Sequence, residues 1–445
     1  MRSKVRAATK VPGARPLGLP TRPRVVILGG GFAGLESAFT LRQRLGDEVD
    51  LAVVAKEPTF LFKPNTIYIP FGGDEERLYI PLSRPLRRRD IRFHQGTVAE
   101  VDPDRRAVDL EDGTRLPYDF LVLATGAAMR PDEVPGLGEF AQTIWTPAQM
   151  QALGARLRRI KLEAKIGRRA AVLFVVPPNN KCSGPLYEIV FMLETWLRRE
   201  GIRDNVDLTW TTYESGYIQA FGPRLHEVVE RQFAARGIEG HTNSVVAKIG
   251  PDEVIYNGGG EARPYDLLIA FPPYGAAVDY PALPTDDRGF VHTELATRRV
   301  TGHPEIYAPG DAGDFPVKQA FLAFLQADAA ADDIASAIDP RLARKARPFD
   351  PVSMCVMEMF DTATFAQVPL ELSGDPARPV RVRASASTQY RVGVRPTWRL
   401  GKKALGIYLP LQFKAGRPFH GGRSWQAMEV ALRGMSRVLA TGAGE

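Results

Sequence analysis

Two cysteines are the residues of this 445-residue chain with the most distinctive chemistry. Cys182 lies in the run Lys-Cys-Ser-Gly-Pro, which follows an apolar segment and precedes an expected helix. A thiol reacts as its thiolate, and a neighbouring cation or helix amino terminus favours that form. Because Lys181 and the expected helix adjoin Cys182, the sequence predicts a lowered thiol pKa there. The alternative for Cys182 and for Cys355 is a small buried apolar side chain, the usual fate of a free cysteine.

A glycine-rich turn follows the first apolar segment. Residues 25–28 (Val-Val-Ile-Leu) indicate a buried parallel strand, and Gly29, Gly31 and Gly34 follow in G-x-G-x-x-G spacing before an apolar pattern of helical period. This strand–turn–helix order is the fingerprint of a dinucleotide-binding fold. The glycines let the backbone approach a pyrophosphate, and the helix amino terminus supplies unpaired N–H groups to its charge.

Further strands place polar residues at the same edge of this fold. A second strand is expected over 49–54, and Glu57 follows it either as a ribose ligand or as an exposed loop residue. The segment 118–126 indicates a strand that ends in Ala-Thr-Gly, and 306–311 indicates one that ends in Gly-Asp.

A second dinucleotide-type fold is expected downstream, with a different turn. Its first strand, 170–176, runs into Pro177 and Pro178, and no glycine occurs in the turn. Proline lacks a backbone N–H, so two donors that a pyrophosphate would need are missing. The turn therefore disfavours a nicotinamide nucleotide, although the fold itself can persist through the strand expected at 265–271.

The order of these motifs resembles the two-dinucleotide-fold flavoproteins. The contexts Cys-x-Gly-Pro-x-Tyr-Glu at 182–188 and Cys-x-x-x-Met-x-Asp-Thr at 355–362 resemble the sulfide:quinone oxidoreductases, with the flavocytochrome c sulfide dehydrogenases as relatives. The resemblance implies FAD-dependent oxidation of sulfide, or of a related small sulfur compound, to persulfide or polysulfide, with electrons passed to a membrane quinone. It implies that Cys182 and Cys355 form a redox-active disulfide beside the flavin, Cys355 nearer to it.

The resemblance also implies roles for charged residues and for the glycine turns. Glu188 would handle protons near the thiols, and Lys318 would lie near the flavin; the alternatives are a glutamate favoured by the helix dipole and a solvated lysine. The residues expected to bind FAD are Gly29, Gly31, Phe32, Ala33, Gly34, Glu57, Val98, Ala124, Thr125, Gly126, Gly310, Asp311 and Lys318. No metal is expected, because the six histidines lack ligand spacing.

Two departures from the family pattern concern the substrate. Many members carry a third cysteine before the second fold, where this chain has Trp145, and a histidine nearby, where it has Gln149. The three-cysteine subtype is thereby excluded. The length of the sulfur product and the identity of the sulfur substrate stay open.

The net charge of +7 is concentrated at the two ends of the chain. Residues 1–24 hold seven Lys or Arg and no acid, and 395–445 hold nine against two Glu. Residues 424–440 place apolar side chains on one face of a basic helix, which suits the surface of a lipid bilayer; the alternative is packing on the body or on a partner chain. No apolar run reaches the roughly 20 residues of a membrane span. The same positive charge could bind nucleic acid, but no recognised nucleic-acid-binding motif accompanies it.

The predicted architecture is α/β: two Rossmann-like dinucleotide-binding folds with a C-terminal β-rich and amphipathic-helix region that binds the membrane. The expected divisions are a disordered basic extension (1–23), an FAD-binding domain (24–165), a second Rossmann-like domain (166–285), a return to the FAD-binding domain (286–340) and the C-terminal interface (341–445). We expect a peripheral, monotopic enzyme at the cell membrane, and a homo-oligomer is compatible with the sequence. Alternatives are a type II NADH:quinone oxidoreductase-like flavoenzyme, a flavocytochrome subunit, and a non-catalytic flavin-binding or sulfur-carrier scaffold.

Overall fold

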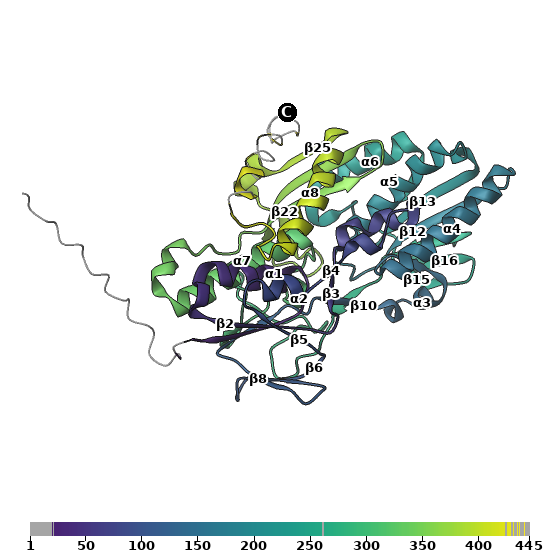
Figure 1. Ribbon diagram of the computed structural model, residues 1–445. Coiled ribbons are helices and arrows are strands. Elements are labelled where there is room, and N and C mark those ends of the chain that lie inside the picture. Colours follow the sequence, from purple (N-terminus) through teal and green to yellow (C-terminus); the bar gives the residue numbers. More distant parts are fainter. Residues whose placement is uncertain are drawn as a thin grey trace, which may run out of the picture.

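The computed structural model describes residues 20, 22–259, 262–422, 425–428, 430, 434, 436 and 440 (Figure 1). The basic extension expected at 1–23 lies almost entirely outside these residues. The helix expected at 424–440 also lies largely outside them. Among the described residues, no helix combines the length and the apolar character that crossing a membrane requires.

The first sheet carries the glycine turn. Its strand order is β20 (Arg299–Val300), β21 (His303–Tyr307), β9 (Phe120–Leu123), β1 (Arg24–Leu28), β2 (Asp50–Ala55) and β5 (Arg92–Gln95), and all but β20 are parallel to their neighbours. Because side chains alternate along a strand, Val25 and Ile27 pack under the helices α1 (Phe32–Leu45) and α7 (Ala320–Ile338). Val26 and Leu28 pack on the opposite face.

The second sheet is wholly parallel. Its order is β11 (Gln142–Thr143), β18 (Leu267–Ala270), β12 (Ala170–Val176), β13 (Val206–Thr212) and β14 (Ile238–His241). The helices α4 (Pro147–Lys165), α5 (Gly184–Arg199) and α6 (Pro223–Arg236) pack on it around a shared apolar core. The two Rossmann-like folds expected from the sequence are confirmed. Since β11 and α4 belong to this second sheet and core, the change of fold comes before the expected boundary at 165.

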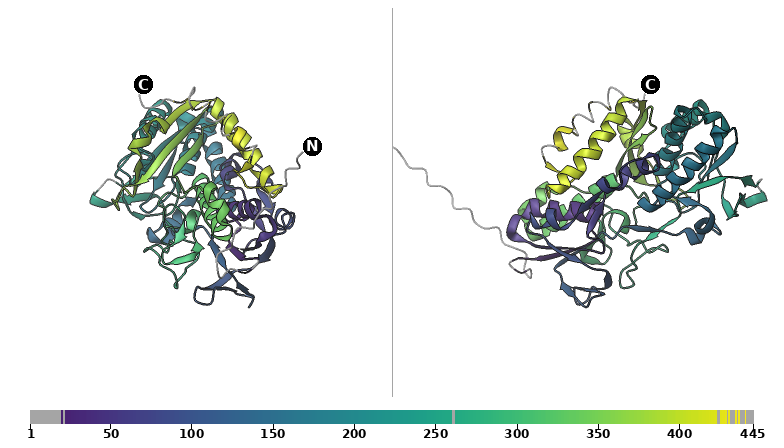
Figure 2. Two further views of the ribbon diagram at one scale, coloured as in Figure 1. Left: turned by 90° about the vertical axis from the view of Figure 1, so that its left-hand side faces the viewer. Right: turned by 45° about the vertical axis from the view of Figure 1, so that its right-hand side comes forward.

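The C-terminal region is a small antiparallel sheet covered by one helix. The strands β22 (Val352–Glu358), β23 (Ala363–Leu372), β24 (Val380–Val382) and β25 (Arg391–Arg395) precede α8 (Thr397–Lys414). This arrangement agrees with the β-rich stretch expected after residue 340. Figure 2 shows α8 along the outside of this sheet, and its last turns approach α1.

Short elements complete the fold. A ribbon of β10 (Ala127–Met129) and β19 (Tyr274–Ala276) joins the two folds. The other strands are β3 (Thr59–Leu61), β4 (Tyr79–Pro81), β6 (Val98–Asp102), β7 (Ala107–Leu110), β8 (Arg115–Pro117), β15 (Val246–Ile249), β16 (Glu253–Tyr256) and β17 (Arg263–Pro264), and the remaining α-helices are α2 (Ser83–Arg87) and α3 (Leu137–Phe140).

Candidate active site

The glycine turn after β1 has one tightly packed side and one open side. A Cβ on Gly29, whose φ is +117°, would lie 2.1 Å from the carbonyl oxygen of Ala124, and one on Gly34 would lie 2.0 Å from that of Gly29. A Cβ on Gly31 would meet no atom within 4 Å. The helix α1 begins directly after Gly31, with no side-chain cap and no acid in its first turn. Its unpaired N–H groups and the open side of Gly31 suit an anionic pyrophosphate.

The Gly-Asp turn after β21 lies against this glycine turn. A Cβ on Gly310 would lie 2.8 Å from that of Ala33, so residues far apart in sequence are in contact here. The Asp311 carboxylate accepts no hydrogen bond from the described residues; burial raises its pKa, against the effect of Lys318 and Lys63. An unpaired acid beside the open turn fits a hydroxyl-rich ligand chain. These residues therefore fit a dinucleotide cofactor.

The remaining residues expected at the cofactor lie around these turns. Gly126 has a φ of +79° and open space around its Cβ position, and the Thr125 hydroxyl is 3.0 Å from that of Tyr280. Phe32 packs edge-on to Phe60, with ring centroids 4.9 Å apart. Glu57 is exposed just beyond β2, and Val98 begins β6 half-buried. The roles of all of them in cofactor binding stay predictions.

Two lysines lie near Asp311. Lys318 is buried, donates to the Gly313 carbonyl and lies 3.7 Å from the ring centre of Phe290. Burial lowers its pKa to about 7. Lys63 begins the 3₁₀ segment Lys63–Phe71 and lies near enough to Asp311 to interact with its charge. Burial lowers the pKa of Lys63 to about 8. No sequence motif indicates Lys63, because only tertiary packing brings it to the site.

Cys182 occupies the turn between β12 and α5, which an asparagine organises. The Asn180 side chain donates to the carbonyls of Phe271 and Pro272, at 2.8 and 3.2 Å, and accepts the Cys182 N–H at 3.1 Å. The carbonyl of Asn179 accepts the Tyr274 N–H at 3.0 Å. A side-chain amide and two prolines thus take the place of a glycine loop in this turn.

Cys355 lies in β22, and the fold brings it close to Cys182. Both are half-buried and pack against the same apolar core. Both are free thiols in this structure, so the disulfide that the resemblance implies is not formed here. The expected lowering of the Cys182 pKa is wrong. Burial, and next the negative charge of Cys355, raise the Cys182 pKa to about 12, against the effect of the Gly184 N–H.

A network of charged side chains surrounds the thiols. Glu188, in the first turns of α5, accepts hydrogen bonds from Lys402 of α8 and, at 2.7 Å, from the backbone N–H of Glu358. Glu358 is fully buried and accepts from Arg399 at 2.6 Å and from the Tyr68 hydroxyl at 3.0 Å. Burial raises the pKa of Glu188, with Lys402 as the largest opposing influence. No sequence motif predicts a role for Glu358, Arg399 or Lys402. The position of Glu358, three residues after Cys355, could have indicated a carboxylate near the thiol.

Three comparisons with known proteins bear on this site. The family model "Pyridine nucleotide-disulphide oxidoreductase" matches residues 23–173. A sulfide-quinone reductase of Aquifex aeolicus is 31% identical over 258 residues, which are 56% of this chain and 58% of that protein. The chain thus aligns with less than two thirds of that relative's length. The solved sulfide:quinone oxidoreductase of Aquifex aeolicus superposes with a TM-score of 0.77 at 22% identity, over 92% of this chain and 96% of that one.

The chain is thus similar to sulfide:quinone oxidoreductases in sequence and shares their fold. It also resembles NADH-linked relatives: an alternative NAD(P)H-ubiquinone oxidoreductase of Arabidopsis thaliana is 28% identical over 374 residues, 72% of this chain and 68% of that protein. The Asn180-organised turn lies where a glycine loop would be expected in a nucleotide-binding second fold.

An aromatic group fills the position where many family members have a third cysteine. Trp145 lies 5.7 Å from Tyr274 and 5.9 Å from Phe271, between ring centroids, and the Lys63 ammonium lies 3.2 Å from its ring centre. Gln149, where the family histidine is expected, instead completes a capping box with Thr146 at the start of α4.

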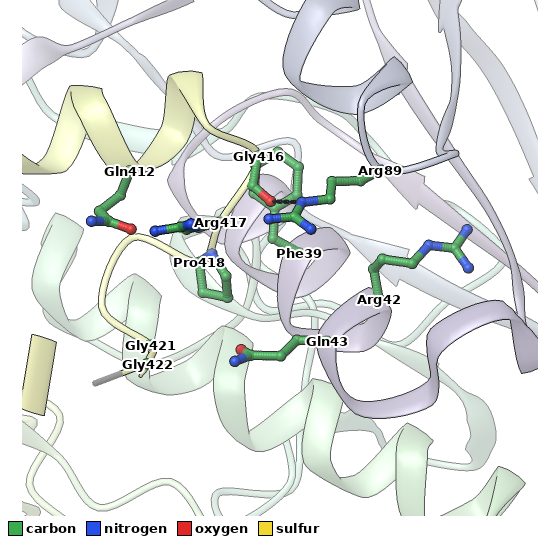
Figure 3. A pocket seen from close by; sticks show the side chains of 10 residues that line it. All are labelled: Phe39, Arg42, Gln43, Arg89, Gln412, Gly416, Arg417, Pro418, Gly421 and Gly422. Atoms are coloured by element: carbon green, nitrogen blue, oxygen red, sulfur yellow. Dashed lines mark hydrogen bonds between the residues drawn. The ribbon is translucent and has the colours of Figure 1, made fainter. Parts of the chain in front are cut away.

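A separate cavity of about 490 Å³ lies at the other end of α8 (Figure 3). There Arg89 donates to the Gly416 carbonyl at 2.6 Å, and Arg88 donates to that of Lys414 at 2.9 Å. Cations at the carboxyl end of a helix bind its free carbonyls and stabilise its dipole. These arginines therefore anchor α8, and none of the residues expected at the active site lines this cavity.

Proposed function

We propose that this chain is a FAD-dependent oxidoreductase that transfers electrons from sulfide, or a related small sulfur compound, to a membrane quinone. The observation that carries the proposal is the convergence of Cys182 and Cys355, from different folds, in one half-buried cluster with Glu188. Glycine turns and Asp311 that fit a dinucleotide support the choice of cofactor.

The chemistry proposed for the cysteines begins from their disulfide. Hydrosulfide attacks one sulfur, a new S–S bond forms, and the Cys182–Cys355 bond breaks to leave a persulfide and a thiolate. Glu188 accepts the proton of the hydrosulfide. A second hydrosulfide takes the outer sulfur away as a free persulfide, which leaves two thiolates. The two thiolates re-form the disulfide and release an electron pair; FAD, which Gly31 and Asp311 would hold, would supply the acceptor between this pair and a quinone.

Positive side chains support the negative charges of this cycle. Lys318 lies beside Asp311 and would hold negative charge near the flavin ring. Trp145 takes the position of the third cysteine and packs with aromatic neighbours against the same core as the thiols, so two cysteines are left to carry sulfur. We therefore propose a short persulfide as the product.

The proposed place of reaction is the surface of the membrane. Leu400, Ile407 and Leu411 on α8 are exposed by 68, 65 and 58% of their surface. A lipid-soluble quinone is available only at the bilayer, so an apolar helix face beside the redox site suits its access.

The test is anaerobic addition of sulfide, then of quinone, to the flavin-loaded protein. We expect bleaching of the flavin absorbance by sulfide and recovery with quinone, both abolished in Cys182→Ala and Cys355→Ala. Met354→Leu is the control, because Met354 packs on the other face of β22. Normal turnover of both cysteine variants would refute the dithiol mechanism. Bleaching by NADH instead of sulfide would favour a type II NADH:quinone oxidoreductase, and bleaching by neither would favour a flavin-binding scaffold.

A further inference from the structure

The helix α8 has two opposite faces that serve different surroundings. Leu400, Ile407 and Leu411 lie on its outer face and are largely exposed. Arg399 and Lys402 lie on the inner face and reach buried carboxylates of β22 and α5. Because residues three or four apart share a helix face, the two inner cations are held together against the thiol cluster.

Lys402 is tied to two points beside Cys355. Its ammonium donates to Glu188 and, at 3.0 Å, to the backbone carbonyl of Val356, the residue after Cys355. The side chains of Lys402 and Glu188 are only 11 and 10% exposed. A charge-assisted hydrogen bond at such a site is stronger than one in water.

The two carboxylates of the cluster differ in their hydrogen bonding. Glu358 is fully buried and accepts from Arg399, from Tyr68 and from the N–H groups of Met359 and Phe360. Within the described part of the chain, Glu188 accepts from Lys402 and from one backbone N–H. Loss of Lys402 would leave Glu188 with a single donor from the described residues, whereas Glu358 would keep Tyr68 and two N–H groups without Arg399, so the charge of Glu188 depends more strongly on α8.

The charged and titratable groups that act on Glu188 come from four segments. They are Lys402 of α8, Glu358 and Cys355 of β22, Cys182 of the turn before α5, and Tyr68 of the 3₁₀ segment Lys63–Phe71. Glu188 raises the pKa of Cys355, after burial as the first cause, and Lys402 lowers it. Lys402 is the only cation with a hydrogen bond to Glu188 among the residues that the structure describes.

We propose that Lys402 is a positioning residue that holds the Glu188 carboxylate ionised beside Cys355. In that form Glu188 can accept the proton that hydrosulfide loses on attack. The S–H bond breaks, the proton passes to the carboxylate oxygen, and the electron pair stays on sulfur. This step rests on the proposed function; the charge that Lys402 imposes on Glu188 does not.

The first test follows flavin bleaching by sulfide against pH in the flavin-loaded protein. We expect an acid limb in wild type that moves up by about one pH unit or more in Lys402→Met, since an opposite charge within hydrogen-bonding distance lowers a carboxyl pKa by about 1–3 units. Lys402→Arg keeps the charge and should restore the limb. Lys403→Met, an exposed neighbour on the same helix, should leave it unchanged. An unshifted limb in Lys402→Met would overturn the proposal.

A second measurement needs no turnover. Infrared titration of the protein should show a carboxylic-acid band, absent in Glu188→Gln, whose midpoint rises by about one pH unit or more in Lys402→Met. Failure of the proposed function would abolish bleaching in wild type and leave this shift intact. A Glu188 midpoint that is equal in wild type and Lys402→Met, with normal thermal unfolding of both, would contradict the role of Lys402.

Discussion

At the scale of single residues, Gly29 and Gly31 make separable predictions. In Gly29→Ala the new Cβ would clash with the Ala124 carbonyl at a φ of +117°, so we expect lost stability as well as lost flavin. Backbone strain alone costs about 1–3 kcal/mol. In Gly31→Ala the Cβ would enter only the open space assigned to the cofactor. That variant should unfold at the wild-type temperature in the apo form and purify with little flavin, as measured by calorimetry and by absorbance per chain.

Asn180 gives a prediction about the position of Cys182. Asn180→Ala removes a buried side chain with three hydrogen bonds, two of which leave carbonyls unpaired. Each unpaired buried group costs about 1–3 kcal/mol. We expect lower thermal stability and slower bleaching by sulfide, with unchanged flavin content because Asn180 is outside the cofactor turns. Wild-type bleaching kinetics would show that Asn180 does not position the thiol.

Residue types predicted those site residues that stand in local sequence motifs. They did not predict properties that depend on burial. The glycine turn, the cysteines, Glu188 and Asp311 stand in recognisable runs. The lowered pKa expected for Cys182 was wrong because desolvation, which no local run encodes, outweighs the helix amino terminus. No role was predicted for Lys402, because its partner Glu188 lies more than 200 residues away in sequence and only the fold brings the two together.

At the scale of elements, the segment after α8 is fastened to the first fold by a buried ionic cluster. Glu36 of α1 accepts the N–H groups of Phe419 and His420, and the His420 ring nitrogen Nδ1 lies 3.1 Å from Glu36 and 3.3 Å from Asp328 of α7. His420 and these two acids also form a group that could ligate a metal ion. Because Glu36 already binds two backbone N–H groups, we assign the cluster to docking.

This cluster predicts how stability depends on pH. The acids raise the pKa of His420 above its ordinary value despite burial, so its contribution is complete below about 6.5 and is lost as pH rises through the higher folded value. Burial raises the pKa of Asp328 to about 6, so the folded chain also holds that proton more tightly and stability falls in the same direction. We expect the melting temperature to fall as pH rises, first between about 4 and 6 through Asp328 and then above about 6.5 through His420.

His420→Ala should remove the part of this dependence above about 6.5 and destabilise the chain by about 3–5 kcal/mol near pH 6.5, as expected when a buried ionised acid loses its partner. His303→Ala, which alters a histidine of β21 outside the cluster, is the control and should keep the wild-type profile. Calorimetry against pH makes the comparison. Parallel profiles for wild type and His420→Ala would show that the cluster does not titrate on unfolding.

Elements were more predictable than their boundaries. The strand 170–176 is found with the expected bounds, because a short apolar run between polar turns is typical of a buried strand and the turns mark its ends. The helix α8 was not predicted as a helix, because its apolar and basic residues alternate between an inner and an outer face and Pro410 interrupts the pattern. The early strand β11 has two residues, too few for any periodicity.

At the scale of the whole molecule, α8 should decide where the protein works. Leu400, Ile407 and Leu411 form an exposed apolar row, and burying about half of each side chain in lipid would contribute roughly 3 kcal/mol in all, or roughly 100-fold in binding. We expect the triple serine variant to lose flotation with vesicles of anionic phospholipid. Leu162→Ser with Ile166→Ser, which alters two similarly exposed residues at the carboxyl end of α4 and just beyond it, should float as wild type does. The α8 variant should keep bleaching by sulfide and reduction of a short-chain soluble quinone, but lose reduction of a long-chain quinone held in vesicles. Unimpaired reduction of the vesicle quinone would place the quinone entrance elsewhere, because the inner face of α8, with Lys402 against Glu188, is intact in that variant.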